Sequence, residues 1–78
     1  MLTDVENKIL EKLSKVSLAN RKEIEKFLIN ECGIQDNVSD IFESATKSLK
    51  EKGLISAINP VGSTCFVITR RGTKIVNS

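Results

Sequence analysis

The stretch LKEKGLISAINPVGSTCFVITRRGTK, Leu49 to Lys74, contains the pattern that decides the fold. It begins with a charged helix end that Gly53 terminates, because glycine readily adopts the left-handed conformation of a helix cap. Two runs rich in β-forming residues follow, 54–59 and 64–69, separated by the turn sequence PVGS at 60–63. Proline presets the backbone of a turn and glycine tolerates positive φ, so these residues predict a β-hairpin.

Side chains alternate between the two faces of a strand. In the second run of the hairpin, Phe66 and Ile68 are therefore predicted to face the core, with Cys65 and Val67 on the opposite face. Thr69 follows directly and can cap a helical turn after the hairpin. The remaining tail to residue 78 is short.

Three helices are predicted before the hairpin, over residues 4–15, 21–31 and 38–52. The first two begin with capping boxes, Thr3 with Glu6 and Asn20 with Glu23. A short β-tolerant segment, 16–19, lies between them. Either Asn37 or Ser39 can cap the third helix. That helix carries one apolar stripe at helical spacing, formed by Val38, Ile41, Phe42, Ala45 and Leu49.

The length of 78 residues predicts a single domain, spanning 1–78, with a small aliphatic core. No apolar run approaches the ~20 residues that a membrane span needs. The N-terminus lacks the basic-then-apolar pattern of a signal peptide, so we expect a cytoplasmic protein without a membrane partner. Cys32 and Cys65 are expected to be buried free thiols, the alternative being a disulfide.

The sequence does not favour an enzyme. It contains no histidine, no glycine-rich phosphate loop and no nucleophile–base pair. Zinc takes clustered cysteine and histidine ligands, which are absent here, so we expect neither a metal site nor a cofactor.

Charge is divided unequally between the two halves of the chain. Residues 1–43 carry six Lys/Arg and nine Asp/Glu, a net charge of −3, whereas residues 44–78 carry six Lys/Arg and one Glu, a net charge of +5. Such asymmetry indicates a polyanionic partner, the alternative being a solvated basic face without a partner.

The order of elements resembles the winged helix-turn-helix DNA-binding domains, in particular the small regulators of archaeal viruses and plasmids. The resemblance rests on Leu-Lys-Glu-Lys-Gly-Leu-Ile at 49–55 and on Phe-Val-Ile-Thr-Arg-Arg-Gly at 66–72, and it covers nearly the whole chain. It implies an α+β winged helix-turn-helix fold, a three-helix core with a C-terminal β-hairpin wing. It also implies sequence-specific binding of double-stranded DNA, with the third helix in the major groove, and transcription regulation.

The candidate DNA contacts follow from this docking. Base contacts are expected from the third helix, at Ser44, Thr46, Lys47 and Lys50. Phosphate contacts are expected near helix starts and after the wing, at Arg21, Lys22, Asn37, Ser39, Arg70, Arg71 and Lys74. Weaker wing contacts are expected from Asn59, Ser63 and Thr64.

A winged-helix module that binds another protein is the alternative function. Asp40 and Glu43 on the third helix favour it, because carboxylates repel phosphate. An exposed patch formed by Ile29, Val61 and Val67 would also favour it. No dimerisation helix is recognisable after the wing, so we expect a monomer in solution that can pair on DNA.

Overall fold

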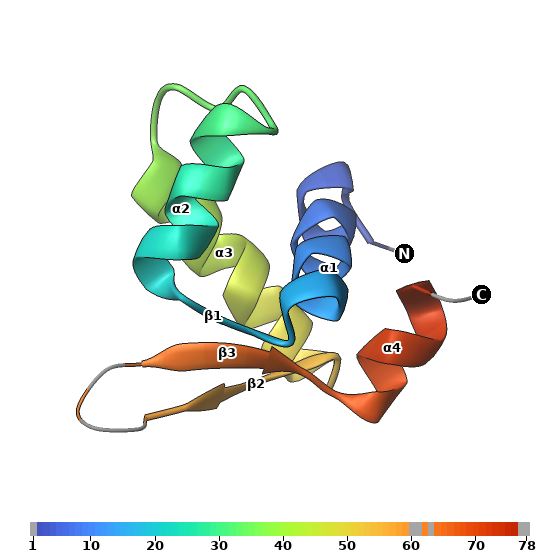
Figure 1. Ribbon diagram of the computed structural model, residues 1–78. Coiled ribbons are helices and arrows are strands. Elements are labelled where there is room, and N and C mark those ends of the chain that lie inside the picture. Colours follow the sequence, from blue (N-terminus) through green and yellow to red (C-terminus); the bar gives the residue numbers. More distant parts are fainter. Residues whose placement is uncertain (1, 60–61, 63, 77–78) are drawn as a thin grey trace.

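The computed structural model describes residues 2–59, 62 and 64–76. In that part of the chain, four helices and three strands follow one another in the order α1 (Asp4–Val16), β1 (Leu18–Asn20), α2 (Arg21–Asn30), α3 (Val38–Glu51), β2 (Ile55–Ile58), β3 (Cys65–Ile68) and α4 (Arg70–Val76) (Figure 1). The predicted α+β fold is confirmed, and its element order is compatible with a winged helix. None of the described helices is long and apolar enough to span a membrane.

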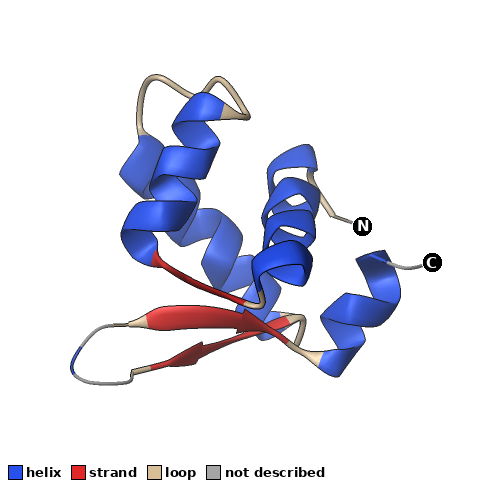
Figure 2. Cartoon of the chain, in the orientation of Figure 1, coloured by secondary structure: helices blue, strands red, loops and turns tan. Residues whose placement is uncertain are grey.

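The three strands form one antiparallel sheet in the order β1-β3-β2. The helices lie on one side of this sheet, and the β2–β3 hairpin extends beyond them (Figure 2). Phe66 on the central strand pairs with Ala19 of β1 and Ala57 of β2. These residues point towards the helices, since Ala19 and Phe66 are buried.

The core lies between the inner face of the sheet and the helices. It is formed by Ile9, Leu10, Leu13, Ala19, Ile24, Leu28, Phe42, Ala45, Leu49, Leu54, Ile55 and Phe66. The rings of Phe42 and Phe66 meet edge to face, with centroids 5.5 Å apart. The predicted inward side of β3 is confirmed, because Phe66 is buried and Ile68 packs against the core. Cys65 and Val67 are half-buried on the other side.

Both predicted capping boxes are present. Thr3 Oγ1 accepts the N–H of Glu6 and the Glu6 carboxylate accepts the N–H of Thr3, and Asn20 and Glu23 make the same exchange at the start of α2. The predicted side-chain cap of the third helix is wrong. Asn37 occupies the cap position in the left-handed conformation, φ 58°, and makes no side-chain cap hydrogen bond. A capping side chain normally needs an extended backbone at that position.

Helix α4 was not predicted as a helix, because its seven residues contain Gly72 and show no full period of apolar residues. The predicted cap at Thr69 is confirmed, since its Oγ1 accepts the N–H of Gly72 at 3.1 Å. The helix packs against α1, and Val76 contacts the core. Tertiary packing therefore stabilises a segment that is too short to be a stable helix alone.

The cysteines are confirmed as free thiols, and both are half-buried. Burial raises the pKa of the Cys32 thiol, so its protonated form is favoured near neutral pH.

Glu6 on α1 is a buried carboxylate, 4% exposed. Burial by itself raises the pKa of Glu6, but hydrogen bonds from Ser48 and Thr3 and the charge of Lys52 outweigh it and lower the pKa to about 2. The Lys52 Nζ lies 3.5 Å from Glu6 Oε2. Glu6 thus joins the start of α1 to the end of α3 through an ionised group.

Acid should weaken the fold through Glu6. Its folded-state pKa lies below the ordinary value of 4.5, so its contribution is complete above about pH 4.5 and is lost as pH falls towards 2. We expect Glu6 to account for a loss of about 3 kcal/mol in the free energy of unfolding, measured by urea titration at successive pH values. Most of this acid-induced loss of unfolding free energy should disappear in Glu6→Gln. It should persist in Glu11→Gln, which changes an exposed residue of the same helix. Equal acid sensitivity in Glu6→Gln and the parent would contradict the assignment.

Candidate nucleic-acid interface

The exposed side of α3 carries charges of both signs. Asp40 and Glu43 lie in its first half, whereas Lys47 and Lys50 lie in its second half together with Glu51, all exposed. Ser44, an expected base contact, is exposed between Glu43 and Lys47. Only the second half of α3 therefore presents cations to solvent, two lysines with one carboxylate beside them.

Thr46 does not belong to this surface, and its predicted base contact is wrong. The residue is 4% exposed, and its Oγ1 donates to the carbonyl of Phe42 at 2.7 Å. The buried arc of α3 is centred on Phe42, Ala45, Thr46 and Leu49. Val38 and Ile41, predicted to lie inside that arc, are only half-buried. The hydroxyl group is tolerated inside because it bonds to its own helix.

Arg21 and Ser39 lie together where α2 and α3 begin. The guanidinium donates to Ser39 Oγ at 2.6 Å and to Glu25 Oε2 at 3.1 Å, and it lies 3.5 Å from Glu43 Oε1. It also lies over the Phe42 ring, 5.0 Å from the centroid. A phosphate at this position would compete with two carboxylates for the same guanidinium, so these two expected phosphate contacts are weakened.

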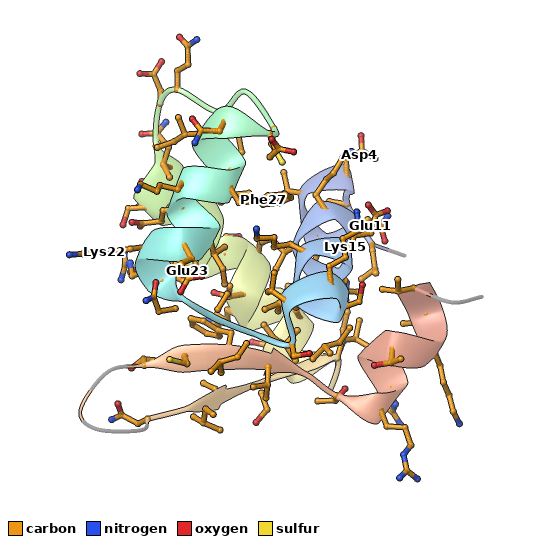
Figure 3. All side chains as sticks on the ribbon, viewed as in Figure 1. Asp4, Glu11, Lys15, Lys22, Glu23 and Phe27 are labelled. Atoms are coloured by element: carbon orange, nitrogen blue, oxygen red, sulfur yellow. The ribbon has the colours of Figure 1, made fainter. Side chains whose placement is uncertain are left out.

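Two further expected contacts, Lys22 and Asn37, also come from the helix starts. Both are exposed. Lys22 projects away from the core on the side towards which the β2–β3 hairpin extends (Figure 3). In the described part of the chain, Glu25 and Glu43 form ion pairs with Arg21, and neither lies within 4 Å of the Lys22 ammonium group.

The basic residues after the hairpin lie on α4 rather than on a strand end. Arg70, Arg71 and Lys74 are exposed there. Arg71 Nη1 donates to the carbonyl of Lys52 at 3.3 Å, at the C-terminal end of α3. A cation at that position satisfies a terminal carbonyl and complements the helix dipole.

A small hydrogen-bonded junction fixes the start of α4 beside the end of α3. Thr69 Oγ1 donates to the carbonyl of Gly53 at 2.7 Å, and the N–H of Thr69 donates to the carbonyl of Leu54 at 3.0 Å. Gly53 has φ +75°, as the turn out of α3 was predicted to require. The start of α4, with Arg70 and Arg71, is thereby held beside the last turn of α3, where Lys50 lies.

Some of the basic residues form ion pairs with carboxylates, and others do not. Arg21 and Lys52 are paired with carboxylates, whereas Lys47, Lys50, Arg70 and Lys74 have no carboxylate within 4 Å among residues 2–59, 62 and 64–76. We call these four residues, together with Arg71, the basic end. It is the part of the described surface best suited to a polyanion.

The wing contributes little charge. Asn59 and Thr64 are exposed at the base of the hairpin turn. Gly62 has positive φ, +79°, as predicted for the turn. Ser63 lies outside the described residues, as do the predicted turn positions Pro60 and Val61.

An open groove between α1 and α2 was not anticipated from the sequence. It has a volume of about 530 Å³ and is lined by Lys8, Glu11, Lys12, Lys15, Glu23, Lys26, Phe27, Asn30 and Glu31. Glu11, Lys15, Glu23 and Phe27 border it in Figure 3. Lys12 Nζ lies 5.7 Å from the centre of the Phe27 ring. Lysines and glutamates alternate around the groove, so its charges largely compensate one another.

No protein-family model matches the sequence, and no curated protein sequence matches it.

Gly72→Ala should loosen the junction that carries the basic end. A Cβ at this position would lie 2.3 Å from the Leu54 carbonyl oxygen and 2.8 Å from Ile68 Cγ1, so the α4 backbone would have to move. We expect the free energy of unfolding, measured by urea titration, to fall by about 2–3 kcal/mol. Lys74→Ala on the same helix should change it by less than about 0.5 kcal/mol. An unchanged Gly72→Ala variant would show that the contact with Leu54 is not tight.

Proposed function

We propose that this protein binds double-stranded DNA and regulates transcription. The observation that carries the proposal is the basic end, where hydrogen bonds from Thr69 and Arg71 hold the start of α4 beside the C-terminal end of α3, the two helices that carry its five cations. The element order, which is compatible with a winged helix, supports the same function. We also propose a cytoplasmic location for it.

In the proposed complex, the second half of α3 enters the major groove. Lys47, Lys50 and Ser44 then contact base edges or nearby phosphates, because lysine donates to guanine and serine to several bases. Arg70, Arg71 and Lys74 bind phosphates beside the groove, as Lys22 does on the hairpin side. Asn59 and Thr64 contact the sugar–phosphate backbone through the wing.

The acidic first half of α3 gives the complex a preferred orientation. Asp40 and Glu43 repel phosphate, so this half is expected to lie away from the DNA backbone or to accept from a cytosine amino group. Arg21 offsets part of the acidic charge by its contact with Glu43. The free chain is proposed to be a monomer at micromolar concentrations, with two copies pairing on DNA.

A protein-binding module is the second candidate. The acidic half of α3 favours it, as do exposed apolar side chains such as Ile29. Ile29 and Val67 belong to the exposed patch that was considered from the sequence, but they do not share one surface. Ile29 lies on α2, whereas Val67 lies on the side of the sheet that faces away from the helices.

Fluorescence anisotropy of labelled duplexes at several salt concentrations tests the DNA proposal. The duplexes are the upstream region of the protein's own gene and a scrambled control. About five phosphate contacts predict a slope of about −4 to −5 in the log–log salt plot, with tighter binding to the upstream duplex. Equal binding to both duplexes would indicate non-specific DNA binding instead of sequence-specific regulation. No binding at about 50 mM salt would overturn the proposal and favour the protein-binding alternative.

Single substitutions separate the roles of the basic residues. Lys47→Ala should reduce the preference for the upstream duplex by about 1–3 kcal/mol, since it removes a base contact. Arg70→Ala should weaken both duplexes similarly and reduce the salt slope by about one. Lys15→Ala removes a lysine of the α1–α2 groove and serves as the matched control, with no change in selectivity. If Lys47→Ala and Arg70→Ala behave like Lys15→Ala, the docking face is wrong.

A further inference from the structure

The side of the sheet that faces away from the helices is largely apolar. Strand register places Leu18 beside Val67 and Ser56 in one row, and Cys65 beside Ile58 in the next row. We call these five side chains the outer sheet face. The side chain of Asn20, which pairs with Cys65, is hydrogen-bonded to the start of α2 and is not counted. Val67 and Cys65 lie at its centre, because β3 is the central strand.

No helix in the described part of the chain packs on this face, although Cys65 and Val67 at its centre are half-buried. All four helices lie on the opposite side of the sheet or beyond its end (Figure 1). Leu18 is 43% exposed and Ile58 is 42% exposed, on the two edge strands. Apolar side chains gathered on one exposed surface usually mark a contact with another molecule.

The chemistry of the face restricts its partner. None of its five residues is charged, and the whole stretch 54–69 lacks a charged residue. A charged partner surface would lose its hydration here without gaining an opposite charge. The partner surface is therefore uncharged and apolar, and the same face on a second copy has both properties.

We propose that two copies of this chain pair through their outer sheet faces. A symmetric contact places the same side chains on both sides, so an uncharged face avoids the like-charge repulsion that a charged face would create. Stacked sheets pack at about 10 Å, which brings Val67 and Cys65 of the two central strands opposite one another.

The size of the face makes this pairing weak. Five residues a side is far below the roughly 20–30 residues a side of a stable interface. We expect a dissociation constant of about 0.1–1 mM, which leaves the free chain monomeric at micromolar concentrations. The proposal does not depend on DNA binding, although DNA would promote the pairing by raising the local concentration.

Concentration-dependent amide spectra of the 15N-labelled protein test this pairing without DNA. Between about 50 µM and 1 mM, the amide signals of the outer sheet face, including Leu18, Ser56 and Val67, should shift along one binding curve. Leu18→Lys and Ile58→Lys place a charge on opposite edges of the face, and each should abolish the shifts. Ile29→Lys makes the same change at a 47% exposed site on α2 and should retain them.

Each alternative result rejects the proposal. Constant spectra up to about 1 mM would show that the face does not pair with itself and would favour a different protein as its partner. Shifts confined to another surface would place self-association elsewhere. Shifts on the outer sheet face that persist in both lysine variants, with folded spectra, would show that its apolar side chains do not drive the contact.

A chemical cross-link provides an independent readout. In Cys32→Ser the remaining thiol is Cys65, and a bismaleimide spanning about 10 Å should join two copies at high concentration. In Cys65→Ser the remaining thiol is Cys32, on the segment after α2, and cross-linking should fall to the level of random collision. Equal cross-linking of the two variants would contradict pairing through the sheet.

Discussion

The hydrogen bond from Thr69 Oγ1 to the Gly53 carbonyl, 2.7 Å long, is the contact on which the arrangement of the molecule depends. It joins the residue that leaves the hairpin to the residue that enters it, so it closes the hairpin at its base. The same hydroxyl accepts the N–H of Gly72 and starts α4. Because Gly72 has no side chain, α4 can approach the Leu54 carbonyl and lie beside the end of α3.

Ion pairs inside the molecule determine which charges remain for a partner. Glu6 holds Lys52 between α1 and α3, and Glu25 and Glu43 hold Arg21 where α2 and α3 begin. The acidic first half of the chain thus neutralises some of its cations, and the basic end keeps the charge that is proposed to meet DNA. The outer sheet face is formed by the three strands, whereas the basic end is on α3 and α4. DNA binding and pairing of two copies therefore need not compete for the same residues.

Much of the fold could be predicted because its signals are local. The capping boxes at Thr3 and Asn20, the positive φ of Gly53 and the alternation along β3 each involve residues only a few positions apart. The candidate site was predicted less well. Exposed positions such as Lys47 and Lys50 follow from helical spacing, but the same spacing put Thr46 at the edge of the surface. A small rotation of α3 about its axis exchanges which edge residues are buried, and only packing fixes that rotation.

The sequence by itself determined where the first three helices and the hairpin occur, which face of β3 is buried, and that the second half of the chain is basic. Only the tertiary structure decided that residues 70–76 form a helix, that Arg21 is held by Glu43, and that Leu18 and Ile58 share one uncharged face with Val67. The physical reason is the range of the interactions. Caps, turns and periodicity act within a few residues, whereas these contacts join segments that are distant in the chain and form only once the core has packed.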